Sequence, residues 1–340
     1  VNKEMAAGII HPLLGAKKKA SLKENRSVDC SCVQGSIQYR INAFKDNEGL
    51  VAAIRALGTE IPQPESIGFP NNVWEDIIRL KHGLVLFTGI TGAGKSTTIS
   101  SLIERINRDR ACRIITLEDP IEYLYSQGNS VISQREVGRD VDTFSDGLRA
   151  MMREDPDVIF VGEMRDRETI ETALHAADSG HLVFSTLHTL DAKETINRIV
   201  SSFAMEEQPR IRLSLASVLQ GVISQRLVPT IEGKRAAALE VMVKTPFIAQ
   251  LILENRDVEI RDAIEEGREI YGSQSFDQHL LDLWNKKIIS TEETFNFATS
   301  PADLKLKMQG MGGKIGKTKV KGAEDETEFA EDEIFQIKKD

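Results

Sequence analysis

The sequence predicts an α/β fold built on a mostly parallel sheet, and two observations carry that prediction. From residue 71 to about residue 230, short apolar runs alternate with helix-compatible stretches, as in strands joined by crossover helices. Within that region, a glycine-rich loop at residues 89–96 separates an apolar run from a stretch free of glycine and proline. A proline-rich stretch at residues 61–70 precedes this region and indicates a smaller N-terminal unit.

Residues 1–64 are predicted to form the N-terminal unit. Lys17–Lys19 lie in a lysine-rich helical start, and Ser36–Phe44 alternates polar and apolar residues with the period of a half-buried strand. The linker to the next domain begins at Ile61. Because the chain begins with Val1 rather than Met, we expect it to be a fragment or a processed form of a protein.

Residues 65–310 are predicted to form the main domain. The expected strands are Leu84–Phe87, Ile114–Leu117, Val158–Val161 and Leu182–Ser185, and the expected helices are Thr97–Arg108, Glu168–Ala177 and Ala192–Phe203. Residues 240–308 are predicted to be mainly helical. The segment Glu324–Glu333 has seven acids in ten residues, so residues 311–340 are predicted to be a disordered acidic tail.

Composition excludes several classes of protein. The net charge of −9, from 43 basic and 52 acidic residues, opposes a dedicated nucleic-acid binder. The three cysteines, Cys30, Cys32 and Cys112, are too few for a disulfide framework or a four-ligand zinc site, and they fit a reducing cytoplasm. No apolar run approaches the roughly 18–20 residues of a membrane-spanning helix, and no signal peptide is visible.

The glycine-rich loop carries the strongest functional signal. Residues Gly89–Ser96 read GITGAGKS and fit the pattern G-x-x-x-x-G-K-[ST]. Glycines let backbone N–H groups surround phosphate oxygens, and the helix start adds partial positive charge. Lys95 can reach the β- and γ-phosphates, and the hydroxyl of Ser96 can bind Mg²⁺. The alternative is a glycine-rich turn before an ordinary helix, but the strand-loop-helix context favours nucleoside triphosphate binding.

Hydrolysis requires a carboxylate near the phosphates, and two candidates are present. Glu163 follows the apolar run Val158–Val161, and Glu118 follows the run Ile114–Leu117. Ligands of α/β sheets bind at the carboxyl ends of such strands. Acids in these positions are often helix N-caps or solvated loop residues. Together with the phosphate loop, the pattern favours Glu163 as the general base acting on water, and Glu118 as a supporting acid that orients the metal.

Two histidines flank the apolar run Leu182–Ser185. His181 precedes this run and His188 follows it. A lone histidine is usually a satisfied polar residue, but two beside a nucleotide site suggest a sensor of the γ-phosphate. A strand of five or six residues holds the pair roughly 20 Å apart, which disfavours metal binding by both.

Four segments, in this order, resemble one known family. They read GITGAGKST (89–97), TLEDPIEY (116–123), REDPDVIFVGEMRD (153–166) and SGHLVFSTLHT (179–189). These resemble the Walker A, Asp, Walker B and His boxes of the GspE/PulE secretion-superfamily ATPases. Over residues 35–308 the chain most resembles the PilT/PilU-type motors of type IV pili. The resemblance implies a RecA-like P-loop ATPase domain preceded by a partial PAS-like α+β N-terminal domain.

The same resemblance implies an activity and partners. It implies a homo-hexamer that hydrolyses ATP, with Mg²⁺, to power pilus retraction and twitching motility. The expected location is the cytoplasm, peripheral at the inner-membrane face, beside an inner-membrane pilus platform protein. A paralogous retraction ATPase is a further expected partner, and no nucleic acid is expected.

Site residues follow from the resemblance by position. Glu163 matches the Walker B glutamate, Glu118 the Asp-box acid and His188 the His-box histidine. Arg40 and Arg55 resemble N-terminal-domain arginines that reach a nucleotide in the ring, although residue type alone favours surface salt bridges. The expected nucleotide-binding residues are Gly89, Thr91, Gly92, Ala93, Gly94, Lys95, Ser96 and Thr97, and the expected Mg²⁺ ligands are Ser96 and Glu163.

Four alternative functions stay open on the sequence. The chain can be an accessory paralogue of the retraction motor, or a pilus-assembly or type II secretion ATPase, although those relatives usually carry a four-cysteine zinc insert. A RecA-like nucleic-acid translocase is disfavoured by the 6% aromatic content and the acidic charge. A non-hydrolysing accessory subunit is disfavoured by the presence of Lys95, Ser96 and Glu163.

Overall fold

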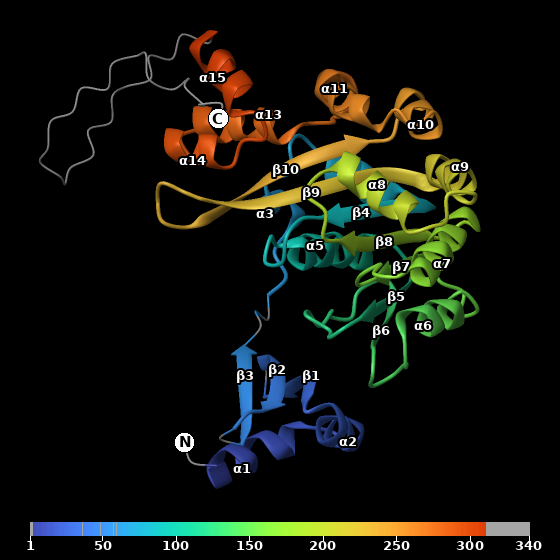
Figure 1. The fold of residues 1–340 in the computed structure, drawn as a ribbon, viewed down its shortest axis with the longest axis vertical. Coiled ribbons are helices and arrows are strands. Elements are labelled where there is room, and N and C mark those ends of the chain that lie inside the picture. Colours follow the sequence, from blue (N-terminus) through green and yellow to red (C-terminus); the bar gives the residue numbers. More distant parts are fainter. Residues whose placement is uncertain (1–2, 36, 48, 57, 59, 311–340) are drawn as a thin grey trace, which may run out of the picture.

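The computed structural model describes residues 3–35, 37–47, 49–56, 58 and 60–310. Figure 1 shows a small N-terminal unit and a larger body that contains a seven-stranded sheet. The predicted acidic tail, residues 311–340, lies outside the described residues. Along the described parts of the chain, none of the helices combines the length and the apolar character that crossing a membrane requires.

The N-terminal unit packs two helices on one face of an antiparallel sheet. Its elements are α1 (Lys3–Leu13), α2 (Ala16–Asn25), β1 (Ser27–Gln34), β2 (Ile37–Lys45) and β3 (Leu50–Ala56), with strand order β1-β2-β3. Apolar side chains such as Ile10, Leu22 and Ile41 form its core. Alternate strand residues point away from that core, so the opposite face is available to the larger body.

The large sheet has the order β10-β9-β4-β8-β7-β5-β6. Neighbouring strands run parallel as far as β9, and β10 pairs antiparallel with β9. The strands are β4 (Gly83–Thr88), β5 (Arg113–Glu118), β6 (Val131–Glu136), β7 (Val158–Val161), β8 (Leu182–Leu187), β9 (Leu219–Pro229) and β10 (Arg235–Val243). The predicted α/β fold with a mostly parallel sheet is confirmed.

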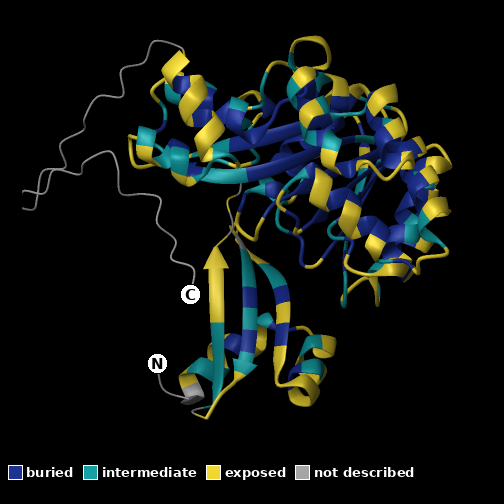
Figure 2. Cartoon of the chain, turned by 45° about the horizontal axis from the view of Figure 1, so that its top comes forward, coloured by how far each residue is buried: buried dark blue, intermediate teal, exposed yellow. Residues whose placement is uncertain are grey.

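Helices cover both faces of this sheet, which explains the unbroken apolar runs of β4, β7 and β8. On one face, α4 (Val73–Arg79) and α5 (Lys95–Asp109) pack on residues such as Val85 and Phe87. The other face, which includes Leu84 and Leu86, is covered by α6 (Phe144–Met151), α7 (Arg167–Asp178), α8 (Ala192–Ser201), α9 (Gln208–Val218), α10 (Pro246–Leu253) and α11 (Ile260–Glu266). Figure 2 shows that this sheet is largely buried, in contrast to β3, which is exposed along its second half.

Shorter helices complete the body. A one-turn helix, α3 (Pro64–Ile67), lies inside the predicted proline-rich linker. Near the carboxyl end, a 3₁₀ turn (Asp257–Glu259) and α12 (Arg268–Tyr271) are followed by α13 (Phe276–Asn285), α14 (Thr291–Asn296) and α15 (Pro301–Gly310). Phe276 and Leu280 of α13 pack against Val228 and Ala238, so the last helices rest on the β9–β10 hairpin.

Three strands of the body, β6, β9 and β10, are absent from the sequence prediction. β6 reads VISQRE and β9 reads LQGVISQRLVP, and their glutamine, serine and arginine residues interrupt the apolar run. β10 extends to Val243, so the segment predicted as mainly helical begins with the end of a strand. β6 and β10 are the edge strands, where polar side chains are tolerated.

Candidate functional site

The strand order brings four predicted segments to one edge of the sheet. Neighbouring strands β4, β8, β7 and β5 are parallel, so their carboxyl ends lie side by side. The phosphate loop follows β4, His188 follows β8, Glu163 follows β7, and Glu118 ends β5. This edge is where ligands of parallel α/β sheets bind.

The phosphate loop needs its glycines for steric reasons. Gly89 has φ +137° and Gly94 has φ +93°, values that favour glycine. A Cβ on Gly89 would lie 2.4 Å from the carbonyl oxygen of Gln225, and one on Gly94 would lie 2.7 Å from the Gln225 side-chain nitrogen. Gly92, at φ +82°, faces open space. A side chain at Gly89 or Gly94 would therefore push the loop away from Gln225 of β9 and change the loop conformation.

The first turn of α5 completes an anion site. The helix begins at Lys95, and Gly94 before it provides no side-chain cap, so the first backbone N–H groups are available to a phosphate. Ser96 and Thr97 on this turn are half-buried, and the hydroxyl of Thr97 lies 3.0 Å from that of Tyr123. Of the remaining loop residues, Thr91 is exposed and Ala93 is buried. The residues present fit a bound triphosphate.

Lys95 holds its ammonium group inside the loop. Its Nζ donates to the carbonyl oxygens of Gly89 at 2.7 Å and Ile90 at 3.2 Å, and it lies 3.4 Å from His188 Nδ1. Burial lowers the pKa of Lys95, while the charges of Glu163 and Glu122 act to raise it. The ammonium is therefore kept at the position where a β- or γ-phosphate would meet it.

Glu163 faces the same point from β7. Its Oε1 lies 3.3 Å from His188 Nε2, and its Oε2 accepts a hydrogen bond of 2.7 Å from Arg165 Nε. The side chain is 17% exposed, so the carboxylate is sheltered but open to water. Helix capping after β7 is done by Asp166, which accepts from the N–H of Thr169, and Glu163 is left for another role.

Glu118 lies deeper than Glu163. Its carboxylate is buried and accepts from Thr116 Oγ1 at 2.7 Å and from Gln134 Nε2 at 3.3 Å. Burial raises the pKa of Glu118 to about 7, against the opposing effect of these hydrogen bonds. The N–H of Glu122 points at its second oxygen from 3.4 Å, so Glu118 supports the segment that carries Glu122 and Tyr123.

The N-terminal sheet turns a polar row toward this site. Ser31, Arg40 and Arg55 lie directly opposite one another on β1, β2 and β3. Ser31 donates to Glu136 at the end of β6, and Arg40 Nη1 lies 3.4 Å from Glu122 Oε1. Arg55 is exposed, and in the described part of the chain its side chain has no hydrogen bond or ion pair with another residue. The structure thus brings Arg40, but not Arg55, to the segment that carries Glu122 beside the phosphate loop.

His181 lies at the amino end of β8, opposite the phosphate loop. Its Nδ1 is 2.9 Å from the carbonyl oxygen of Ala176 and 3.1 Å from Ser179 Oγ, which are local contacts. The two histidines therefore lie at opposite ends of β8, and of the two only His188 contacts Lys95 and Glu163. Among the described residues, no cluster of three or more histidine, cysteine, aspartate or glutamate side chains could hold a metal.

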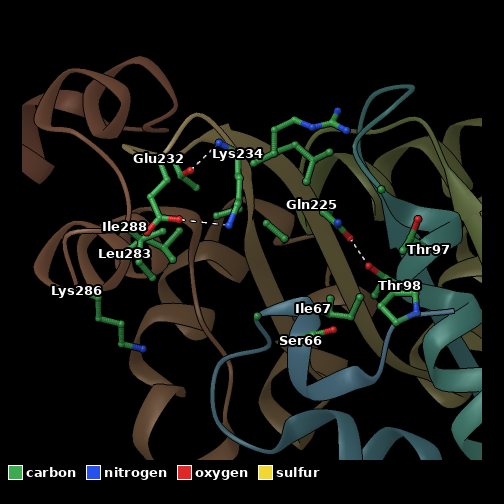
Figure 3. Close-up of a pocket in the computed structure, with 18 of the residues that line it drawn as sticks. Ser66, Ile67, Thr97, Thr98, Gln225, Glu232, Lys234, Leu283, Lys286 and Ile288 are labelled. Atoms are coloured by element: carbon green, nitrogen blue, oxygen red, sulfur yellow. Dashed lines mark hydrogen bonds and ion pairs between the residues drawn. The ribbon is translucent and has the colours of Figure 1, made fainter. Parts of the chain in front are cut away.

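A cavity of about 860 Å³ opens beside the first turn of α5. Figure 3 shows Thr97 and Thr98 on one side of it and Leu283 and Ile288 on the other, with Ile67 of the linker at its base. Such a volume accommodates a small molecule. Sequence reasoning missed this cavity and also Gln225, whose Oε1 accepts from Thr98, because β9 and the last helices are brought here by tertiary packing.

Comparison with known proteins identifies a family and several similar sequences. A model of the Type II/IV secretion system protein family matches residues 34–275. The type IV pilus retraction ATPase PilT of Pseudomonas aeruginosa is 41% identical over 294 residues, which cover 86% of this chain and 85% of PilT. A twitching motility protein of Neisseria gonorrhoeae is 37% identical over 291 residues, covering 85% of this chain and 77% of that protein.

Solved structures agree with the fold. The crystal structure of the pilus retraction motor PilT with bound ADP matches with a TM-score of 0.81 at 43% identity, and covers 88% of this chain and 85% of that chain. The ATPase DotB of Legionella pneumophila matches with a TM-score of 0.74 at 30% identity, and covers 89% and 82%. The chain therefore belongs to the Type II/IV secretion system protein family, whose ATPases include PilT.

Proposed function

We propose that this protein is an ATPase that powers type IV pilus retraction. The observation that carries the proposal is the line of contacts Lys95–His188–Glu163 at the mouth of the phosphate loop. It joins a phosphate-binding cation to a sheltered carboxylate, which are the two groups that hydrolysis needs. The similarity to PilT over most of both chains supports the pilus as the structure on which the motor acts.

The loop and helix bind the substrate. Backbone N–H groups of residues 89–97 surround the phosphates of ATP, and the ammonium of Lys95 exchanges its loop carbonyls for phosphate oxygens. The cavity beside Thr97 and Thr98 receives the nucleoside. Ser96 and Glu163 provide hydroxyl and carboxylate oxygens, the ligand type that Mg²⁺ prefers, and that ion would supply positive charge beside the phosphates.

Glu163 activates the attacking water. The water oxygen bonds to the γ-phosphorus while one of its protons passes to the Glu163 carboxylate. The bond between the γ-phosphorus and its bridging oxygen breaks, and ADP and phosphate leave. His188 lies between Lys95 and Glu163, so it contacts the γ-phosphate position and reports whether that phosphate is present. Glu118 holds the Glu122–Tyr123 segment in place.

The motor works as a homo-hexamer in which the PAS-like N-terminal unit contributes arginines to the RecA-like ATPase domain. Arg40, which also faces Glu122, lies directly opposite Arg55, and a further anion beside them would offset the repulsion of the two like charges. A nucleotide phosphate at a subunit interface provides that anion, and a planar guanidinium can grip its developing charge. The exposed Arg55 is free to reach a neighbouring subunit.

The pilus supplies the remaining partners. The protein acts in the cytoplasm at the inner-membrane face, where it contacts the pilus platform protein and a paralogous retraction ATPase. Nucleic acid is not a partner, in keeping with the net charge of −9.

The test combines enzymology with motility. The purified chain is expected to hydrolyse ATP only with Mg²⁺, and to form a six-subunit particle in mass photometry. In its native host, deletion of the gene should abolish twitching, and the wild-type gene but not Lys95→Ala should restore it. A hydrolysing hexamer whose deletion leaves retraction intact would support the accessory paralogue or a secretion ATPase, and a purified hexamer without ATPase activity would contradict the proposal.

A further inference from the structure

A buried polar row crosses three strands and ends at the phosphate loop. Glu240 of β10 lies directly opposite Ser224 of β9, which lies directly opposite Thr88 of β4. Thr88 Oγ1 donates to Ser224 Oγ at 3.0 Å, and Ser224 Oγ donates to Glu240 Oε1 at 3.3 Å. Thr88 is the residue before Gly89, so this row attaches the base of the loop to Glu240.

The same oxygen of Glu240 also holds the segment that follows His188. The N–H of Ala192, the first residue of α8, donates to Glu240 Oε1 at 2.8 Å. The side chain of Asp191 is already engaged, because it caps the helix through the N–H of Glu194. Glu240 therefore satisfies a second N-terminal donor of α8, and its negative charge complements the partial positive charge of that helix end.

These links lie in the protein interior. Thr88 and Ser224 are completely buried, and Glu240 is 6% exposed. Burying a carboxylate is unfavourable, and here burial raises the pKa of Glu240 to about 7, with Asp191 adding to the rise and Arg226 opposing it. An apolar side chain would fill this position at lower cost, so the carboxylate indicates a role beyond packing.

We infer that Glu240 is a positioning residue for ATP hydrolysis. It joins the strand that carries the phosphate loop to the segment that carries His188, through one oxygen atom that accepts from both sides. His188 contacts Lys95 and Glu163, so the distance between the loop and the catalytic carboxylate depends on this junction. The inference rests on the proposed ATPase function and adds a residue outside the four sequence boxes.

The first test separates the effect of the hydrogen-bond acceptor of Glu240 from the effect of its side-chain volume. Glu240→Met keeps the size and removes the acceptor, and it should lower kcat about tenfold while the KM for ATP changes less than about threefold. Glu240→Gln keeps an oxygen that can accept from Ala192, and it should retain kcat within about threefold. Equal kcat values for the wild type and a folded Glu240→Met protein would overturn the inference.

A matched control uses Asp277, another buried carboxylate that accepts backbone N–H groups. It is 2% exposed, and its hydrogen-bond partners Thr299, Ser300 and Arg261 all lie outside the phosphate loop and outside the segment that follows His188. Asp277→Leu should lower the melting temperature without lowering kcat per folded protein. If it lowers kcat as much as Glu240→Met does, the effect of Glu240 is one of general stability and the inference fails.

A double-mutant cycle tests whether Glu240 acts through His188. In a His188→Ala background, Glu240→Met should cause less than about a twofold further loss of kcat, because the side chain that Glu240 positions is gone. The inference would be contradicted if the fold-losses of kcat in the two single variants multiplied in the double variant. Ser224→Ala removes the hydroxyl that joins Thr88 to Glu240, and it should also lower kcat. An unchanged kcat would contradict a role for this row of hydrogen bonds.

Hydrogen exchange separates this inference from the proposed function. The Ala192 amide should exchange slowly in the wild type and in Glu240→Gln, and at least about tenfold faster in Glu240→Met. Unchanged exchange refutes the junction even if the protein is an active ATPase. A wild-type protein without ATPase activity refutes the proposed function, and with it the role of Glu240 in hydrolysis, even if the exchange result shows that the junction exists.

Discussion

Lys95 keeps an ammonium group among the carbonyl oxygens of its own loop, and this contact is replaced when a phosphate binds. Lys95→Ala removes that cation, so we expect ATP binding to weaken by about ten- to a hundredfold. Isothermal titration with Mg-ATP measures the affinity. Lys81→Ala, at an exposed lysine before β4, is the matched control and should bind normally. Normal binding by Lys95→Ala would remove Lys95 from the site.

Glu118 makes the stability of the main domain depend on pH. Burial raises its pKa in the folded protein to about 7, from an ordinary value of 4.5, so the folded state binds the proton more tightly than the unfolded state. The resulting stabilisation is present in full below about pH 4.5 and is lost as the pH rises through 7. Between pH 5 and pH 8, the wild type should lose roughly 2–3 kcal/mol relative to Glu118→Gln.

Urea unfolding of both proteins at the two pH values measures this difference. Since all other titrating groups are shared, they cancel when the free energy of unfolding of the variant is subtracted from that of the wild type. A pH-independent difference would show that the Glu118 carboxyl titrates as it does in water.

Single residues also show how far sequence reasoning reaches. The positions of the phosphate loop, Glu163 and His188 after their strands follow from local motifs, because the neighbours in sequence form the strand and turn that hold each of them. The Arg40–Glu122 contact and the Glu240 junction were not predictable, because each joins segments far apart in sequence whose proximity depends on strand order. A buried glutamate in LEVMV reads only as an interruption of a strand.

At the scale of an element, the loop between β4 and α5 is constrained unequally along its length. A Cβ at Gly89 would lie 2.4 Å from a backbone oxygen of the neighbouring β9, whereas one at Gly92 would meet nothing within 4 Å. Gly89→Ala should therefore destabilise the protein by roughly 1–3 kcal/mol and impair nucleotide binding. Gly92→Ala carries only the strain of a left-handed backbone, about 1 kcal/mol.

Thermal melting in the presence and absence of Mg-ATP measures both changes. The expected order of stability is wild type, then Gly92→Ala, then Gly89→Ala. Equal melting temperatures for the two variants would mean that the backbone around Gln225 relaxes without cost.

Strands were predictable from the sequence where all of their residues are buried. β4, β7 and β8 are buried on both faces, so each appears as a continuous apolar run. β9 and β6 carry polar side chains at positions that contact the loop or the Glu118 segment, and these residues hid the strands. The signal that could have found β9 and β10 is the turn near Gly233, which separates two stretches that each contain valine and leucine.

At the scale of the whole molecule, the N-terminal unit touches the main domain through acids that flank its nucleotide site. Arg40 faces Glu122, while Arg55 stays exposed on the adjacent strand. In an assembled ring, Arg55→Ala should lower ATP turnover by on the order of a hundredfold, and it should leave ATP binding by an isolated subunit unchanged. Turnover per subunit, measured above and below the concentration of assembly, checks this.

Loss of turnover in the isolated subunit would place Arg55 in its own site, contrary to the geometry. In the sequence, proline and glycine at residues 61–70 predict a boundary between two units. Which side of the small sheet faces the larger body was hidden, because Ser31, Arg40 and Arg55 form a row only once the three strands pair in register.

The most direct test of the central claim measures binding and turnover together on Glu163→Gln. The amide keeps the shape of the side chain but cannot accept the proton of the attacking water. We predict Mg-ATP affinity within about threefold of the wild type and turnover lower by at least about a hundredfold. Turnover by Glu163→Gln at the wild-type rate would contradict the claim that this carboxylate activates water for hydrolysis.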